Sequence, residues 1–126
     1  MVERRGIQAL RQYEIWWADL ARPAGRRPIM LLSREDAYGY LNKFIAVEIT
    51  TTIRGIPVEV ALGKAEGLSK RCVANFDNLR TIGRSALRQQ IGVLGRSRRF
   101  EAKRALGYAL GWDELTDLES IRTRVH

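Results

Sequence analysis

The sequence of 126 residues contains a single histidine, His126, and a single cysteine, Cys72. A lone histidine at the last position excludes a catalytic pair of histidines, a Ser-His-Asp triad and a histidine-based zinc site. A lone cysteine excludes an internal disulfide, which favours a reducing, cytoplasmic setting. No histidine or second cysteine neighbours Cys72, so we interpret it as a small buried apolar residue.

Long apolar segments are also missing. The longest runs, such as residues 29–32, fall far short of the roughly 20 residues that a membrane-spanning helix needs. Residues 1–12 carry charges and no apolar segment of a signal peptide, so we expect a cytoplasmic protein. The nucleotide-binding motif Gly-x-x-x-x-Gly-Lys-Ser/Thr is absent and the acidic residues lack metal-binding spacing, so we expect no cofactor and no metal.

Charge of one sign dominates. Lysine and arginine together number 22 against 14 acidic residues, which gives a net charge of +8. Only four of the 22 are lysines, which leaves 18 arginines. A guanidinium group stays protonated and can donate two hydrogen bonds at once to the oxygens of a phosphate. This composition favours a nucleic-acid partner, although solubility alone could also account for it.

The apolar pattern indicates one domain over residues 1–126, with residues 1–12 as a lead-in and 113–126 as a helical extension. Alternating or continuous apolar runs predict short strands over residues 13–20, 28–33, 44–52, 58–62, 71–76, 79–82 and 91–94. A short helix or turn is expected over residues 34–41. Many short strands followed by one helix favour a small, strongly bent sheet or barrel closed by a C-terminal helix.

The pattern changes to a helical period near the C-terminus. The sequence predicts a helix over residues 98–110, with Ser97 as its N-cap and Gly111 as its C-terminal stop. Its apolar stripe follows the spacing i, i+3, i+4, i+7, i+8 and consists of Ala102, Ala105, Leu106, Ala109 and Leu110.

Without histidine or a metal site, an enzyme built from this chain must work with arginine, threonine, serine, tyrosine or backbone groups. RNA permits this, because its 2′-hydroxyl is a nucleophile next to the phosphate, and cationic or hydrogen-bonding groups can stabilise the transition state. Two segments offer such groups: Arg26–Arg27 at a turn, and Thr50–Thr52 at a strand end, followed by Arg54. Taken alone, each is also explained as a solvated turn or an ordinary strand sequence.

The order of the motifs along the chain is a more specific indication of function than either segment alone. YEIWWADL, RRPIMLLS, FIAVEITTTIRGIPVEVAL and GLSKRCVANFDNLRTIG follow one another and precede a helix, over about residues 13–112. In this order they resemble the MazF/PemK/Kid family of toxin endoribonucleases. The resemblance implies a mainly β (α+β) fold, an SH3-like barrel with a C-terminal helix and short appended helices.

The resemblance also implies a toxin of a type II toxin–antitoxin system that cuts single-stranded RNA without a metal, leaving 2′,3′-cyclic phosphate and 5′-hydroxyl ends. It implies a homodimer with RNA in a groove at the interface, and an antitoxin whose C-terminal segment covers the same surface. At the family's catalytic positions stand Arg27, which would neutralise the phosphorane, and Thr50, which would donate a hydrogen bond to a non-bridging oxygen. Arg27 could also assist proton transfer to the 5′-oxygen, although a guanidinium is a better electrostatic stabiliser than proton donor. No general base is identified.

Further residues are assigned to RNA contact by their places in these motifs. They are Arg26, Thr51, Thr52, Arg54, Asn78 and Arg80. The turn at residues 21–26 is shorter than is usual in the family, which leaves loop-borne RNA contacts open. Trp16 and Trp17 are adjacent on a strand, so their side chains must face opposite sides of the sheet. One is expected in the core. The other is expected in the core as well, at a dimer interface or under an RNA base.

Two other functions remain open at this point. A non-enzymatic gyrase poison of the CcdB type would have a related fold, but that mode needs an apolar C-terminal end with tryptophan, and this chain ends charged. An RNA-binding barrel without catalysis would account for the net charge equally well.

Overall fold

The computed structural model describes residues 10–117, so the expectations for residues 1–9 and 118–126 fall outside it. The sheet order is β4-β5-β3-β2-β1-β6, with every pairing antiparallel. The strands are β1 (Glu14–Asp19), β2 (Arg26–Leu31), β3 (Lys43–Thr50), β4 (Glu59–Leu62), β5 (Cys72–Gly83) and β6 (Leu87–Val93). The helices are α2 (Arg99–Leu110) and α3 (Asp113–Thr116), and the 3-10 turns are η1 (Glu35–Gly39), η2 (Lys64–Glu66), η3 (Arg84–Ala86) and η4 (Arg96–Arg98).

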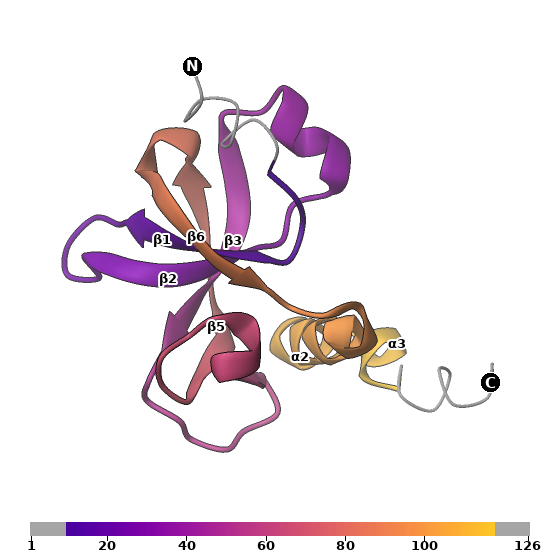
Figure 1. Cartoon of the computed structure of the whole chain (residues 1–126). Coiled ribbons are helices and arrows are strands. Elements are labelled where there is room, and N and C mark those ends of the chain that lie inside the picture. Colours follow the sequence, from indigo (N-terminus) through magenta and orange to yellow (C-terminus); the bar gives the residue numbers. More distant parts are fainter. Residues whose placement is uncertain (1–9, 118–126) are drawn as a thin grey trace.

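The sheet curls into a half-barrel, with α2 and α3 beside its lower part in Figure 1. Neighbouring strand residues point to opposite faces, and the two faces carry two separate apolar clusters. Ile15 and Met30 belong to the cluster that also holds Ala102 and Ala105 of α2, whereas Trp16 and Ile29 belong to the other. The prediction of a mainly β fold with a C-terminal helix is therefore confirmed. None of the helices within residues 10–117 has the length and hydrophobicity of a membrane-spanning segment.

The prediction of separate strands over residues 71–76 and 79–82 is wrong, because both belong to β5. The exposed polar pair Asp77–Asn78 suggests a turn in the sequence, but the chain continues there as a strand. The Asp77 N–H donates to Asn75 Oδ1 at 2.9 Å, close to where the β3–β5 register shifts between Val47 and Ile49. This side-chain bond satisfies the backbone at the irregularity, so the strand need not end.

Two element boundaries also differ from the sequence prediction. The last strand begins at Leu87 rather than at residue 91, because its polar first half pairs with β1 at the edge of the sheet. Ser97 is not the N-cap of the long helix: residues 96–98 form η4, and α2 starts after Arg98 without a side-chain cap. Gly111 is confirmed as the C-terminal stop, with a left-handed φ of 72°.

Candidate active site

The pairing of β2 with β3 brings the two predicted catalytic residues together. Ile29 lies opposite Glu48 in this antiparallel ladder. Continuing the register by two residues on each strand places Arg27 opposite Thr50, on the same face of the sheet as Ile29 and Glu48. The two side chains both line one pocket of about 570 Å³. Residues 23 positions apart in sequence thus meet because of strand register, at the point where β3 ends.

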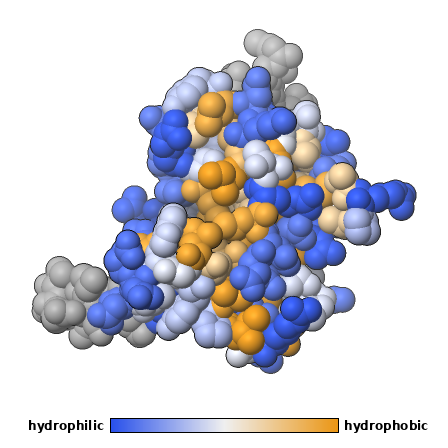
Figure 2. Space-filling view, turned by 180° about the vertical axis from the view of Figure 1, so that it is seen from behind, coloured by the Kyte–Doolittle hydropathy of each residue, from blue (hydrophilic) through white to orange (hydrophobic). Residues whose placement is uncertain are grey.

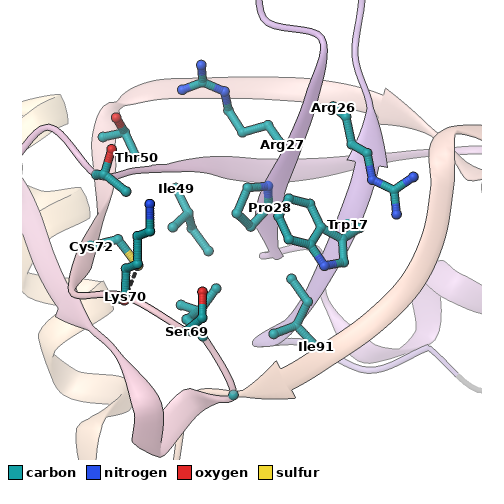
Figure 3. A pocket seen from close by; sticks show the side chains of 13 residues that line it. Trp17, Arg26, Arg27, Pro28, Ile49, Thr50, Ser69, Lys70, Cys72 and Ile91 are labelled. Atoms are coloured by element: carbon teal, nitrogen blue, oxygen red, sulfur yellow. Dashed lines mark hydrogen bonds between the residues drawn. The ribbon is translucent and has the colours of Figure 1, made fainter.

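The pocket is lined by residues of β1, β2, β3, β5 and β6 and of the loop before β5, with Cys72 as the contribution of β5. β1 contributes Trp17, β2 contributes residues 26–28, and the end of β3 contributes residues 49–51. The loop between η2 and β5 contributes residues 67–70 on the opposite wall, and β6 contributes Ile91. The lining joins the apolar side chains of Trp17, Pro28 and Ile49 with the polar groups of Arg27, Thr50 and Lys70, all labelled in Figure 3. The pocket thus combines apolar and cationic groups.

The Thr50 hydroxyl is oriented by the turn that follows β3. The N–H of Thr52 donates a hydrogen bond to Thr50 Oγ1 at 3.1 Å. A hydroxyl has two acceptor sites and one proton, so accepting this bond leaves the Thr50 O–H free to donate to a ligand. The geometry suits stabilisation of an oxygen anion in the pocket.

A carboxylate lies between two arginines beside the pocket. Glu48 Oε2 is 2.7 Å from Nη1 of Arg80, and its Oε1 is 3.8 Å from Nη1 of Arg27. The Glu48 side chain is only 18% exposed, so these charges are partly shielded from water. Glu48 therefore pairs closely with Arg80 and attracts Arg27 more weakly, because 3.8 Å exceeds hydrogen-bond distance.

Residues 11–110 match the family of PemK-like, MazF-like toxins of type II toxin–antitoxin systems. The chain belongs to this family. The matched range contains all six strands and α2 within the described residues, and with them Arg27 and Thr50. The family resemblance found in the motifs is thereby confirmed.

Several similar proteins come from mycobacteria. Probable endoribonuclease MazF2 of Mycobacterium tuberculosis is 35% identical over 103 residues, which cover 81% of this chain and 99% of that protein. The solved structure of the M. tuberculosis toxin MazF-mt6 gives a TM-score of 0.73 at 34% identity, over 78% of this chain and 96% of that one. A mycobacterial endoribonuclease solved with its cognate antitoxin gives a TM-score of 0.73 at 29% identity, over 82% and 97% of the two chains.

In this MazF-like toxin only some of the residues predicted to contact RNA lie at the pocket. Arg26 and Thr51 line it, together with Arg27 and Thr50. The others lie outside its lining and consist of Thr52, Arg54, Asn78 and Arg80. The backbone N–H of Arg54 donates to the Glu59 carboxylate at 3.1 Å, which fixes the course of the loop after β3. Asn78 is exposed on β5, and Arg80 is paired with Glu48.

The two adjacent tryptophans do face opposite sides. Trp16 is 6% exposed in the core, where its indole N–H donates to Glu14 Oε1 at 3.0 Å. Trp17 is partly buried and forms a wall of the pocket. The Arg26 guanidinium lies 5.5 Å from the centre of the Trp17 ring, a cation–π contact seen at the right of Figure 3. Trp17 pairs with Pro28, so its ring lies on the face of the sheet that Arg26 also occupies.

Cys72 lies at the base of the pocket and is 5% exposed, which confirms its interpretation as a buried residue. Burial raises the pKa of the Cys72 thiol, and the negative charge of Glu66 raises it further. The thiol is therefore neutral at physiological pH and is a poor nucleophile. Within residues 10–117, no three His, Cys, Asp or Glu side chains are grouped in a way that could hold a metal ion.

Sequence reasoning missed two charged residues of this site. Glu48 falls in a strand whose alternation is broken by the register shift after Val47, so its neighbours could not be read from the pattern. Lys70 belongs to one of the quoted motifs, but only the fold places its loop across from Thr50. A lysine among 22 basic residues carries no signal of its own in the sequence.

Proposed function

We propose that this MazF-like toxin is a metal-independent, sequence-selective endoribonuclease that cleaves single-stranded RNA or mRNA, leaving 2′,3′-cyclic phosphate and 5′-hydroxyl ends. The observation that carries the proposal is the meeting of Arg27 and Thr50 at one pocket, through the β2–β3 register. Relatives that are named endoribonucleases and cover most of the chain support the same activity. The toxin acts in the cytoplasm, where its RNA substrate is found.

The chemistry follows from the substrate. The 2′-hydroxyl of RNA attacks the neighbouring phosphorus, and negative charge accumulates on the non-bridging oxygens. The Arg27 guanidinium neutralises this charge, and the Thr50 hydroxyl donates a hydrogen bond to one of these oxygens. Because Arg27 already lines the pocket, little movement of its side chain is needed when the phosphate arrives.

The RNA path extends from the pocket in both directions. Arg26 and Thr51 contact the nucleotides next to the cleaved bond, and a base stacks on Trp17 in place of the Arg26 guanidinium. Outside the pocket, the flanking nucleotides meet Thr52, Arg54, Asn78 and Arg80. These contacts set the selectivity for sequence rather than the chemistry.

The active form is a homodimer, with the RNA groove at its interface. Large apolar side chains remain exposed among the described residues, including Ile45 at 52%, Ile53 at 45% and Val93 at 44%. Figure 2 shows apolar side chains gathered in the middle of one face, which supports an interface there. The cognate antitoxin covers the RNA-binding surface, a proposal supported by the similar endoribonuclease that was solved with its antitoxin.

The test is incubation of the purified protein with long single-stranded RNA in EDTA, with mapping of the cut ends. The wild type should give discrete cuts with cyclic phosphates. Arg27→Ala should lose about 10²–10³-fold in rate. Arg96→Ala removes an exposed arginine outside the pocket lining and should cut like the wild type.

Intact RNA from folded wild type would contradict the proposal and favour a gyrase poison or a non-catalytic RNA-binding protein. Full activity of Arg27→Ala would still support a ribonuclease, but it would contradict the assignment of Arg27 to the active site.

A further inference from the structure

The pocket holds a cation that the proposed chemistry has not used. Lys70 lies on the wall opposite β2 and is exposed at the mouth of the loop, and Figure 3 shows its side chain pointing in the direction of Thr50, which lines the same pocket. No acidic side chain among residues 10–117 forms an ion pair with it. By contrast, Arg27 faces Glu48, and Arg26 lies over Trp17. The Lys70 ammonium is thus the uncommitted positive charge of the pocket.

Backbone packing fixes the loop that carries Lys70. Gly67 has a φ of +90°, and its Cα lies so close to β6 that an added Cβ would be 2.3 Å from the carbonyl oxygen of Ile91. Just after Gly67, Leu68 is buried in the core, and two residues after Lys70 the chain enters β5 at Cys72. The Cys72 thiol donates to the Lys70 carbonyl oxygen at 3.5 Å. The loop is therefore anchored on both sides of Lys70, as preorganised catalysis requires.

Among the cationic and thiol groups that line the pocket, Lys70 is the best suited to donate a proton. When the P–O5′ bond breaks, the leaving oxygen requires a proton. Arginines do not release theirs at physiological pH, which sets aside Arg26 and Arg27. The Cys72 thiol is buried and directed at a carbonyl oxygen. An ammonium group is charged at neutral pH, yet it gives up a proton more readily than a guanidinium, so Lys70 suits the task best.

Resting on the proposed ribonuclease function, we propose that Lys70 is a further catalytic residue, the proton donor to the 5′-oxygen of the leaving nucleotide. The O2′ atom attacks phosphorus, the P–O2′ bond forms, and the P–O5′ bond breaks. The proton of the 2′-hydroxyl passes to water. The electron pair of the broken bond stays on O5′, which takes a proton from Lys70 Nζ. The neutral amine is then reprotonated from solvent.

A change of leaving atom separates proton donation from simple charge. Once the cut site is mapped, two short RNAs are made, one with the natural 5′-oxygen and one with sulfur at that bridging position. A thiolate leaves readily without a proton, so its departure does not depend on an acid. Single-turnover rates at saturating protein are compared for the wild type, Lys70→Met and Lys70→Arg. Lys64→Met is the matched control, because Lys64 is exposed nearby on η2 but does not line the pocket.

The proposal predicts that both Lys70 variants cut the oxygen substrate about 10²–10³-fold more slowly, and Lys70→Arg cuts the sulfur substrate within about tenfold of the wild type. Lys64→Met should match the wild type on both. Full activity of Lys70→Arg on the oxygen substrate, or equal losses by Lys70→Arg on both substrates, would overturn proton donation. Failure of the wild type on both RNAs would instead count against the ribonuclease function itself.

Discussion

Replacing Gly92 by alanine tests how the wall that carries Lys70 is held against the sheet. An added Cβ at Gly92 would lie 2.0 Å from the carbonyl oxygen of Glu66 and 2.8 Å from its carbonyl carbon. The obstacle is backbone rather than a flexible side chain, so no change of rotamer can relieve it. Either η2 must move away from β6, or the edge strand must shift against β1.

The cost follows from this geometry. Overpacking in a close-packed region typically lowers stability by about 1–3 kcal/mol. We expect Gly92→Ala to reach the upper end, because two backbone segments must separate. For small domains each kcal/mol lowers Tm by about 2–8 °C, so a loss on the order of 10 °C is predicted. RNA cleavage should also fall in the folded variant, since the loop before β5 carries Lys70.

The assay is urea denaturation together with thermal unfolding, with Gly95→Ala as the matched control. Gly95 has a φ of −62°, and nothing lies within 4 Å of the Cβ that alanine would add there. The control should therefore leave the free energy of unfolding nearly unchanged. Equal stabilities for the two variants would contradict the view that the close approach of Gly92 to Glu66 positions the pocket wall.

Two further predictions concern single side chains of the pocket. Thr50→Val keeps the branched shape but removes the hydroxyl, so single-turnover cleavage should fall about 10²–10³-fold while the thermal midpoint changes little. An unchanged rate would remove Thr50 from the chemistry. Because burial raises the pKa of Cys72, less thiolate is present at a given pH, and iodoacetamide at pH 8 should modify the folded protein at least about tenfold more slowly than the urea-unfolded protein. Mass spectrometry reports the rate, and equal rates would contradict the buried position of this thiol.

The sequence predicts this fold where local pattern decides it. The stripe from Ala102 to Leu110 specifies α2, and Gly111 ends that helix because it adopts a left-handed conformation. Boundaries decided by tertiary pairing were not predictable in the same way. The pair Asp77–Asn78 has the composition of a turn, yet β5 continues through it. There the N–H of Asp77 donates a hydrogen bond to the side-chain oxygen of Asn75.

The residues of the candidate site also differ in whether the sequence predicts them. Arg27 and Thr50 stand out through their family motifs, and the strand register then accounts for their meeting. Lys70 could not be found this way, because its place depends on the close approach of Gly67 to Ile91, which lies 24 residues further along the chain. Close packing of two backbones leaves no periodic trace in the sequence. Glycine is simply the residue that permits it.

In the proposed mechanism, Arg27 and Thr50 act on one phosphate. The most direct test is a double-mutant cycle of Arg27→Ala and Thr50→Val, with cleavage of a mapped RNA measured in EDTA under single-turnover conditions. Groups that act as a unit give non-additive losses, so the double variant should be little slower than the slower single variant. Losses that multiply in full would show that the two residues act independently, and would contradict a shared site.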